Sequence, residues 1–177
     1  YENSELSLSE LENKIGGLPQ VFKALYHQNQ SLIHSNNKVK LLENGEEKFP
    51  ELFKDLKAAK EHIHIEYYIL EDDKLGREFV DILIGKAKEG LEVRLIYDDR
   101  GSRKIGSLAQ ELRKAGGEAY PFMPVHFRSL SQANFRNHRK IIIIDGLIGY
   151  IGVINIADRY WNRGNQDLFW RDTHIKF

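Results

Sequence analysis

The hydrophobic and polar positions of the chain switch between a strand period and a helix period from about residue 38 onward. Apolar residues recur at helical spacing over 49–60, 76–89 and 105–115, and the last two of these segments end at glycines. Between and after the helices, short β-branched or alternating runs predict strands at 38–42, 62–70, 91–97, 118–122, 141–144, 147–151 and 170–177. This order predicts an α/β fold with a mixed, mostly parallel sheet flanked by helices.

The first 36 residues show a different pattern. Residues 5–16 place Leu8, Leu11 and Ile15 at helical spacing, and a second amphipathic helix is expected after Pro19. We therefore predict an N-terminal helical segment, 1–36, ahead of a domain that spans 37–177. An apolar stripe of this kind is typical of a core or docking surface, and contact with a bilayer is the alternative.

Two dipeptides and one long segment are typical of turns and loops. Asn44-Gly45 is the strongest two-residue hairpin signal, and Asp145-Gly146 predicts a turn between two strands. Residues 123–136 predict a loop that leads directly into the isoleucine strand. A loop of this length is a candidate for shaping a site.

Composition excludes several classes of protein. Lys+Arg and Asp+Glu both number 26, so no global charge attracts a nucleic acid, and no nucleic-acid partner is expected. The chain has no cysteine, which removes disulfides and thiolate metal sites and fits a reducing compartment. With 177 residues, 41% of them hydrophobic, it can build a sizeable core. No apolar run is long enough to span a membrane, and the chain is expected to be soluble.

The strongest chemical signal stands where the chain enters the run of four isoleucines. Because side chains alternate along a strand, His138 and Lys140 are expected on one side and Arg139 on the other. Alone, this pair would be read as a solvated polar edge. The spacing His-x-Lys-x4-Asp-x6-Gly-x-x-Asn, from His138 to Asn155, favours a catalytic site instead.

Two other polar clusters have competing interpretations. His62, His64 and Glu66 share one face of a strand and imitate a metal site, although the same alternation is typical of a half-buried strand. Glu66 is the most plausible of the three to reach a site, because ligands gather at the carboxyl ends of strands in α/β sheets. The loop 98–102 follows a strand and could bind a head group, with a solvated, self-paired loop as the default.

The five fixed positions from His138 to Asn155 resemble the motif of the phospholipase D superfamily. From about residue 37 onward the chain resembles the first catalytic half of a bacterial cardiolipin synthase of this superfamily. The resemblance rests on 40–45, 65–69, 86–94, 97–102, 134–140 and on Trp170-Arg171-Asp172-Thr173-His174.

The resemblance implies a metal-independent phosphatidyltransferase that needs no cofactor and uses two such motifs, one in each half. His138 would be the nucleophile that forms a phosphohistidine, or its general-acid partner, and its position in the first half favours the nucleophile. Lys140 and Asn155 would hold the non-bridging phosphate oxygens. Asp172 would accept the other ring N–H of the histidine, with a surface ion pair to Arg171 or Lys176 as the alternative. Gly152 and Glu66 are predicted to line the substrate site. Asp145 is interpreted as structural.

The chain departs from the family pattern in two ways. Gly152 is followed by Val153, where the family usually has glycine or serine, and only one His-x-Lys is present. Three hypotheses follow. In the first, the chain is half of a bacterial synthase that joins two phosphatidylglycerol molecules and reaches the cell membrane through segments outside this chain. The second is a single-motif nuclease or phosphodiesterase that is active as a homodimer, and the third is a non-catalytic lipid-binding domain. In the first case the second catalytic half, or a homodimer partner, completes the site, and the isolated chain is expected to be inactive.

Overall fold

The computed structural model describes residues 20, 24, 28, 37–124, 136–163 and 168–177. The chain divides into two units, Tyr1–Lys38 and Val39–Phe177. In the first unit Gln20, Ala24 and Gln28 are helical and exposed. The rest of the predicted N-terminal helical segment lies outside the described residues, as do residues 125–135 of the predicted loop. The boundary between residues 36 and 37 stays a prediction.

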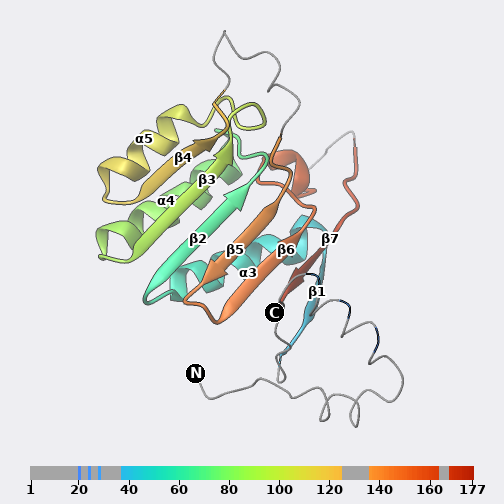
Figure 1. Ribbon diagram of the computed structural model, residues 1–177. Coiled ribbons are helices and arrows are strands. Elements are labelled where there is room, and N and C mark those ends of the chain that lie inside the picture. Colours follow the sequence, from blue (N-terminus) through green and yellow to red (C-terminus); the bar gives the residue numbers. More distant parts are fainter. Residues whose placement is uncertain (1–19, 21–23, 25–27, 29–36, 125–135, 164–167) are drawn as a thin grey trace. The chain divides into compact units, whose positions relative to one another are not determined.

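The second unit is built on one seven-stranded sheet (Figure 1) with the strand order β1-β7-β6-β5-β2-β3-β4. Its strands are β1 Lys40–Glu43, β2 His62–Tyr67, β3 Glu92–Asp98, β4 Glu118–Phe122, β5 Lys140–Ile144, β6 Ile148–Gly152 and β7 Thr173–Lys176. The predicted mixed α/β fold is confirmed. Only the pairs β2–β3 and β3–β4 are parallel, whereas the other four pairs are antiparallel. The parallel share is smaller than predicted, because β5 returns beside β2 in the opposite direction and continues through tight connections.

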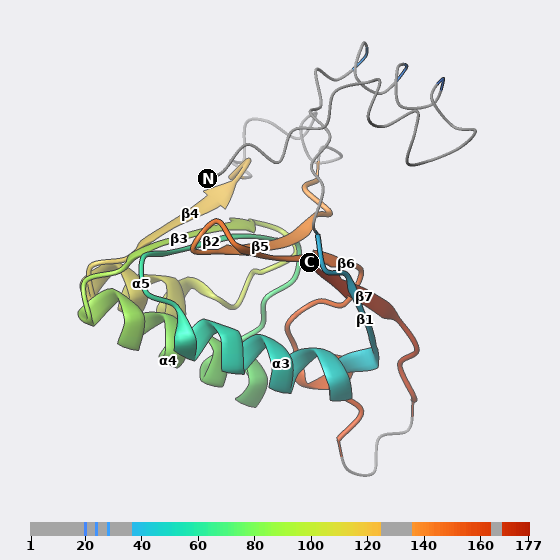
Figure 2. The same cartoon turned by 90° about the horizontal axis from the view of Figure 1, so that it is seen from below.

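Three helices, α3 Asn44–Ala58, α4 Lys74–Lys88 and α5 Gly106–Lys114, cover one face of this sheet (Figure 2). The central strands β2, β3 and β5 therefore bury alternate residues, as in β3, where Val93 and Leu95 are buried and Arg94 and Ile96 are exposed. Beneath the sheet, Phe53 of α3 packs against Trp161 with ring centroids 5.9 Å apart. Burial of such rings supplies much of the stabilisation of a core.

The face opposite the helices carries a row of paired residues that no described helix covers. In register across the seven strands the row reads Leu41, Ile175, Ile151, Ile141, Glu66, Ile96 and Tyr120. Six of these seven side chains are apolar or aromatic, and Ile151 and Tyr120 are both exposed. Exposed apolar area of this extent is typical of an interaction surface.

The hairpin predicted at Asn44-Gly45 is wrong. Asn44 does have a positive φ of 58°, but it turns the chain from β1 into α3 rather than into a second strand. Its backbone N–H donates to Asp172 O at 2.9 Å, and its Oδ1 accepts from Asp172 N at 3.0 Å. At Gly45 a β-carbon would lie 2.1 Å from Tyr160 O, so the glycine permits close packing of the helix start. The dipeptide correctly predicts left-handed backbone at Asn44, but contacts with distant residues determine that a helix follows it instead of a strand.

The turn predicted at Asp145-Gly146 is confirmed, with φ values of 53° and 65° between β5 and β6. The Asp145 carboxylate accepts hydrogen bonds from the backbone N–H groups of Lys60, Glu61 and His62 at 2.9, 2.8 and 3.0 Å. Burial raises the pKa of this carboxyl, but the three N–H donors outweigh burial, so the net shift is downward. The aspartate of the motif thus ties the β5–β6 turn to the start of β2.

We expect Asp145→Ala to lower the free energy of unfolding by roughly 1–3 kcal/mol at pH 7, because three backbone donors lose their acceptor. A lowered carboxyl pKa stabilises the fold above its unfolded value near ~3.9, and this contribution is lost as pH falls through the folded pKa. Urea unfolding at pH 7 and pH 3 measures the difference, which should shrink at the lower pH. Asp81→Ala, at an exposed position on α4, is the control. Equal stability of both variants at pH 7 would contradict the structural role.

Candidate active site

The candidate catalytic pair stands where β5 begins, beside the C-terminal end of β2. Figure 1 shows these two strands side by side in the middle of the sheet. Lys140 opens β5 opposite Tyr67 of β2 and is only 2% exposed. Its Nζ lies 2.9 Å from His138 Nδ1 and donates to His138 O at 2.6 Å. The two side chains therefore meet on one side of the strand, as the alternation predicted.

Asn155 follows β6 and lies at the same end of the central strands as His138 and Lys140. Its Oδ1 accepts a hydrogen bond from Ile69 N at 3.2 Å, which fixes the orientation of the side-chain amide. The next residue, Ile156, forms a bridge with Leu70 just after β2. The other end of the same amide, Nδ2, is a donor that suits an anion.

Burial sets the charges of both side chains, and the Lys140 charge adds to the effect of burial on His138. Partial burial, followed by the nearby Lys140 charge, lowers the pKa of His138. Burial lowers the pKa of Lys140 to about 8, although the negative charge of Asp172 opposes this shift. At neutral pH the site therefore combines an uncharged imidazole with a protonated lysine, which is the combination that nucleophilic attack on a phosphate requires.

Asp172 lies close enough for its charge to raise the pKa values of Lys48 and Lys140. Its Oδ2 accepts from Trp170 Nε1 at 2.5 Å, and no hydrogen bond to His138 is present among the described residues. The alternative ion pairs are not formed there either, since Arg171 contacts Glu43 and Lys176 contacts Glu51 and Asp55. The catalytic role of Asp172 stays a prediction.

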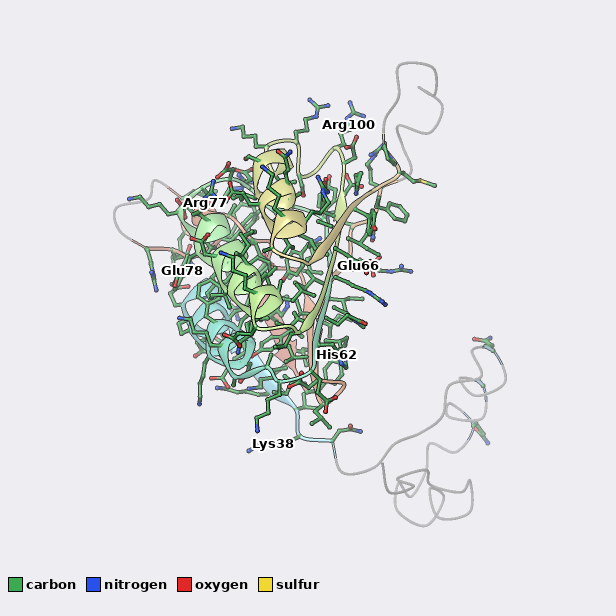
Figure 3. All side chains as sticks on the ribbon, turned by 90° about the vertical axis from the view of Figure 1, so that its left-hand side faces the viewer. Lys38, His62, Glu66, Arg77, Glu78 and Arg100 are labelled. Carbon is green, nitrogen blue, oxygen red and sulfur yellow. The ribbon has the colours of Figure 1, made fainter. Side chains whose placement is uncertain are left out.

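Glu66 holds the residues on either side of His138. Its Oε1 accepts from Asn137 Nδ2 and from Arg139 Nη1, the latter at 3.4 Å. These contacts lie on the sheet face opposite the helices, where Figure 3 shows Glu66 projecting away from α4. In this arrangement Glu66 supports the entry to β5, and its predicted contact with substrate stays a prediction.

The loop after β3 supports the site from beneath. Asp98 is fully buried and accepts from Arg100 N, Gly101 N and Asn137 N, the last at 3.1 Å. Ser102 Oγ donates to Tyr68 O and accepts from Leu70 N. The loop is self-paired, as the default interpretation held, but its aspartate is buried rather than solvated.

The histidines of β2 are engaged with a neighbouring strand. His64 Nε2 lies 2.6 Å from Glu92 Oε1, and the His62 and His64 rings are 4.6 Å apart. Across the described ranges, no group of three or more histidine, aspartate or glutamate side chains is arranged to hold a metal ion. The strand alternation of a half-exposed sheet face accounts for the pattern.

Gly152 lies beside His174 rather than in open space. A β-carbon at this position would stand 2.5 Å from His174 Nδ1, so the missing side chain makes room for the imidazole. His174 is fully buried, and neither ring nitrogen has a hydrogen-bond partner among the described residues. Burial, with the charges of Lys48 and Lys140, lowers its pKa to about 2. The predicted substrate contact of Gly152 stays a prediction. Val153 is exposed and has no positive φ, so it does not strain the loop that carries Asn155.

Sequence reasoning missed two residues that contact the site. The Tyr68 ring lies 4.3 Å from the His138 ring, and Lys140 Nζ stands 5.0 Å from the Tyr68 ring centroid. Lys48 is fully buried on α3 and its charge acts on His174. The signal for Lys48 was its position four residues before Leu52, on the apolar stripe of the helix, where a lysine needs an explanation.

Solved structures resemble this fold closely in shape and distantly in sequence. Nuc from Salmonella typhimurium, a phospholipase D family member, matches with a TM-score of 0.60 and 15% identity over 78% of this chain and 81% of that chain. Phosphatidylserine synthase from Haemophilus influenzae matches with a TM-score of 0.61 and 17% identity over 78% of this chain and 33% of that chain. These matches show that the domain shares its fold with a phospholipase D family member.

The sequence comparison is more specific. The family described as cardiolipin synthase, phospholipase D-like domain, matches residues 52–176, and the chain belongs to this family. A cardiolipin synthase of Halalkalibacterium halodurans is 44% identical over 98% of this chain and 35% of its own length. The major cardiolipin synthase of Bacillus subtilis is 43% identical over 86% of this chain and 32% of its own length. The predicted resemblance is confirmed, and the chain spans about a third of the length of these relatives.

Proposed function

We propose that this domain supplies the nucleophilic half of a phosphatidyltransferase that converts two phosphatidylglycerol molecules into cardiolipin and glycerol. The observation that carries the proposal is the contact of an uncharged imidazole, His138, with the Lys140 ammonium at 2.9 Å. The Asn155 amide, oriented by Ile69 N, adds a second donor for the phosphate oxygens. The substrate is inferred from the relatives, which are named as cardiolipin synthases.

In the first step a lone pair of the His138 ring attacks phosphorus. The N–P bond forms, the bond from phosphorus to the glycerol oxygen breaks, and the leaving oxygen takes a proton from a general acid. Lys140 and Asn155 stabilise the charge that develops on the non-bridging oxygens. In the second step a hydroxyl of another phosphatidylglycerol attacks phosphorus and gives its proton to the conjugate base of the general acid. The N–P bond breaks, which releases cardiolipin and restores the neutral His138 ring.

The contact between Lys140 and His138 in the protein without substrate also indicates why the imidazole needs a carboxylate partner. An ammonium can only donate, so the contact from Lys140 to Nδ1 places the proton of a neutral His138 ring on Nε2. Attack through Nε2 requires this proton to be on Nδ1 instead. The Nδ1–H group can then donate a hydrogen bond to a carboxylate. Asp172 would serve if its carboxylate moved from Trp170 to the imidazole.

The membrane contact and the source of the general acid are also proposals. No described helix is long and apolar enough to cross a membrane. We propose that contact with the bacterial cell membrane comes from segments outside this chain. The general acid would come from a second catalytic half, or from the His138 of another copy.

A chimera tests the proposed function. This chain replaces the matching segment of the Bacillus subtilis relative, and thin-layer chromatography follows phosphatidylglycerol, cardiolipin and glycerol, with a plasmid-nicking assay in parallel. We expect cardiolipin and no nicking. Nicking without lipid turnover would indicate the nuclease alternative, and a folded chimera that is silent in both assays would favour the non-catalytic domain.

The pKa of Lys140 predicts a pH dependence. Because Lys140 stabilises phosphate as an ammonium, kcat/KM of the chimera should fall as pH rises through about 8, by about tenfold per pH unit beyond it. Lys140→Arg, which stays protonated to much higher pH, should remove that limb of the profile even if it lowers the maximum rate. A profile that still falls near pH 8 in the arginine variant would assign the titration to another group.

A further inference from the structure

One buried lysine of the domain, Lys48, has no role in the proposed chemistry, and burial, with the nearby Lys140 charge, lowers its pKa well below the usual value. Lys48 of α3 is 0% exposed, and its Nζ donates to Ile154 O at 2.8 Å and to Tyr67 OH at 2.9 Å. The same nitrogen stands 4.6 Å from the centroid of the Phe49 ring. A lysine is almost never fully buried without such partners, because removing its charge from water is costly.

One hydrogen bond of Lys48 reaches the segment that carries Asn155, and the other reaches the strand beside Lys140. Ile154 directly precedes Asn155 in the chain. Tyr67 is the β2 residue in register with Lys140. Lys48 therefore joins the end of β2 to the segment after β6, at the ends of the strands where the candidate phosphate ligands lie.

The segment that carries Asn155 is held from two sides. On one side, Ile156 N donates to Ile69 O at 3.1 Å and Glu71 N donates to Ile156 O at 3.1 Å. On the other side, the bond from Lys48 is the side-chain contact that fixes the Ile154 carbonyl. If the bond from Lys48 is removed, the Ile154 carbonyl loses its side-chain donor and the peptide between Ile154 and Asn155 is free to shift. The bond from Ile69 N to Asn155 Oδ1 then holds the Asn155 amide alone.

We infer that Lys48 is a positioning residue of the phosphate site, which holds the Asn155 amide in place through the Ile154 carbonyl. The inference rests on the proposed function only in that Asn155 is taken to bind phosphate. The geometric part concerns Asn155 in the free protein and can be measured without any ligand.

Amide NMR spectra of the unliganded chain test the geometric part. Lys48→Met removes the donor and keeps the length of the side chain, and we expect the Asn155 side-chain amide signals to shift or broaden. Lys54→Met, at an exposed position on the same helix, is the matched control and should leave them unchanged. Tyr67→Phe removes one acceptor but keeps the bond to Ile154, so it should also preserve these signals.

Titration with inorganic phosphate, followed by phosphorus NMR, tests the link to the site. We expect Lys48→Met to weaken phosphate binding about tenfold, the factor that corresponds to one hydrogen bond of ordinary strength. In an Asn155→Ala background the same substitution should have no further effect, because Lys48 acts through Asn155. A further loss in that background would overturn the inference and indicate that the lysine charge acts on phosphate directly.

The outcomes separate the two proposals. Unchanged Asn155 signals in folded Lys48→Met protein would overturn the positioning role, whatever the phosphate affinity. Altered signals in a chain whose unsubstituted form binds no phosphate would support the positioning role and count against the proposed phosphate chemistry.

Discussion

Replacement of His138 by alanine is expected to reduce cardiolipin formation by the chimera at least about 10⁴-fold, because removal of a catalytic nucleophile leaves only binding and electrostatic stabilisation. The imidazole stands just before β5 and is kept uncharged at neutral pH by partial burial and by the Lys140 charge, which lower its pKa. Rapid acid-free quenching with labelled phosphatidylglycerol should trap the phosphoryl group on His138, as an adduct that is labile in acid and stable in base.

Two controls make this result specific. His62→Ala, on the sheet face opposite the helices (Figure 3), removes another imidazole and should leave turnover near the level of the unsubstituted chimera. Chelation with EDTA should also have no effect, because Lys140 supplies the positive charge that a metal would otherwise provide. A phosphoryl label on serine would contradict the covalent histidine mechanism, and loss of activity in EDTA would revive the interpretation of His62, His64 and Glu66 as metal ligands.

The sequence was sufficient to predict the part of the site that rests on local periodicity. Alternation along the isoleucine strand predicts that His138 and Lys140 share a side, and the 2.9 Å contact between them agrees with this. The turn at Asp145-Gly146 was predictable for the same reason, since left-handed backbone at both residues is what the dipeptide favours. These features depend on neighbours within the strand or turn.

The features that sequence could not supply depend on contacts between distant residues. Asn44 adopts the predicted left-handed backbone, but its two hydrogen bonds to Asp172 direct the chain into α3 instead of a hairpin. The partners of Lys48 lie 19 and 106 residues away, so the periodicity of α3 could mark the lysine as unusual without identifying what it holds.

The isolated chain is expected to fold and to be essentially inactive as a monomer. Its core is closed by three helices on one sheet face, so folding does not require another half. Catalysis is different, because a phosphorylated His138 cannot also donate the proton that the leaving glycerol needs. A second imidazole must come from another polypeptide segment, and a second copy of this chain can offer its own His138.

The sheet face that no described helix covers suggests where a second copy would pack. Ile151 and Tyr120 are exposed in the row that crosses the seven strands, and Glu66 of the same row binds Asn137 beside His138. If two copies associate through this face, phosphodiesterase activity should be weak, should rise with protein concentration, and should follow the dimer fraction. Size-exclusion chromatography with light scattering, run at the concentrations of the assay, measures that fraction.

A charge placed in the row tests the surface directly. Ile151→Asp should shift the chain to monomer and remove the concentration-dependent activity, because the aspartate would be buried unpaired in the contact. Leu147→Asp, at an exposed position in the turn between β5 and β6, is the matched control and should retain both properties. Dimers that persist in Ile151→Asp would place the contact elsewhere on the domain. Strong turnover by a monomer, independent of concentration, would overturn the requirement for a second histidine and with it the assignment of this chain as half of an active site.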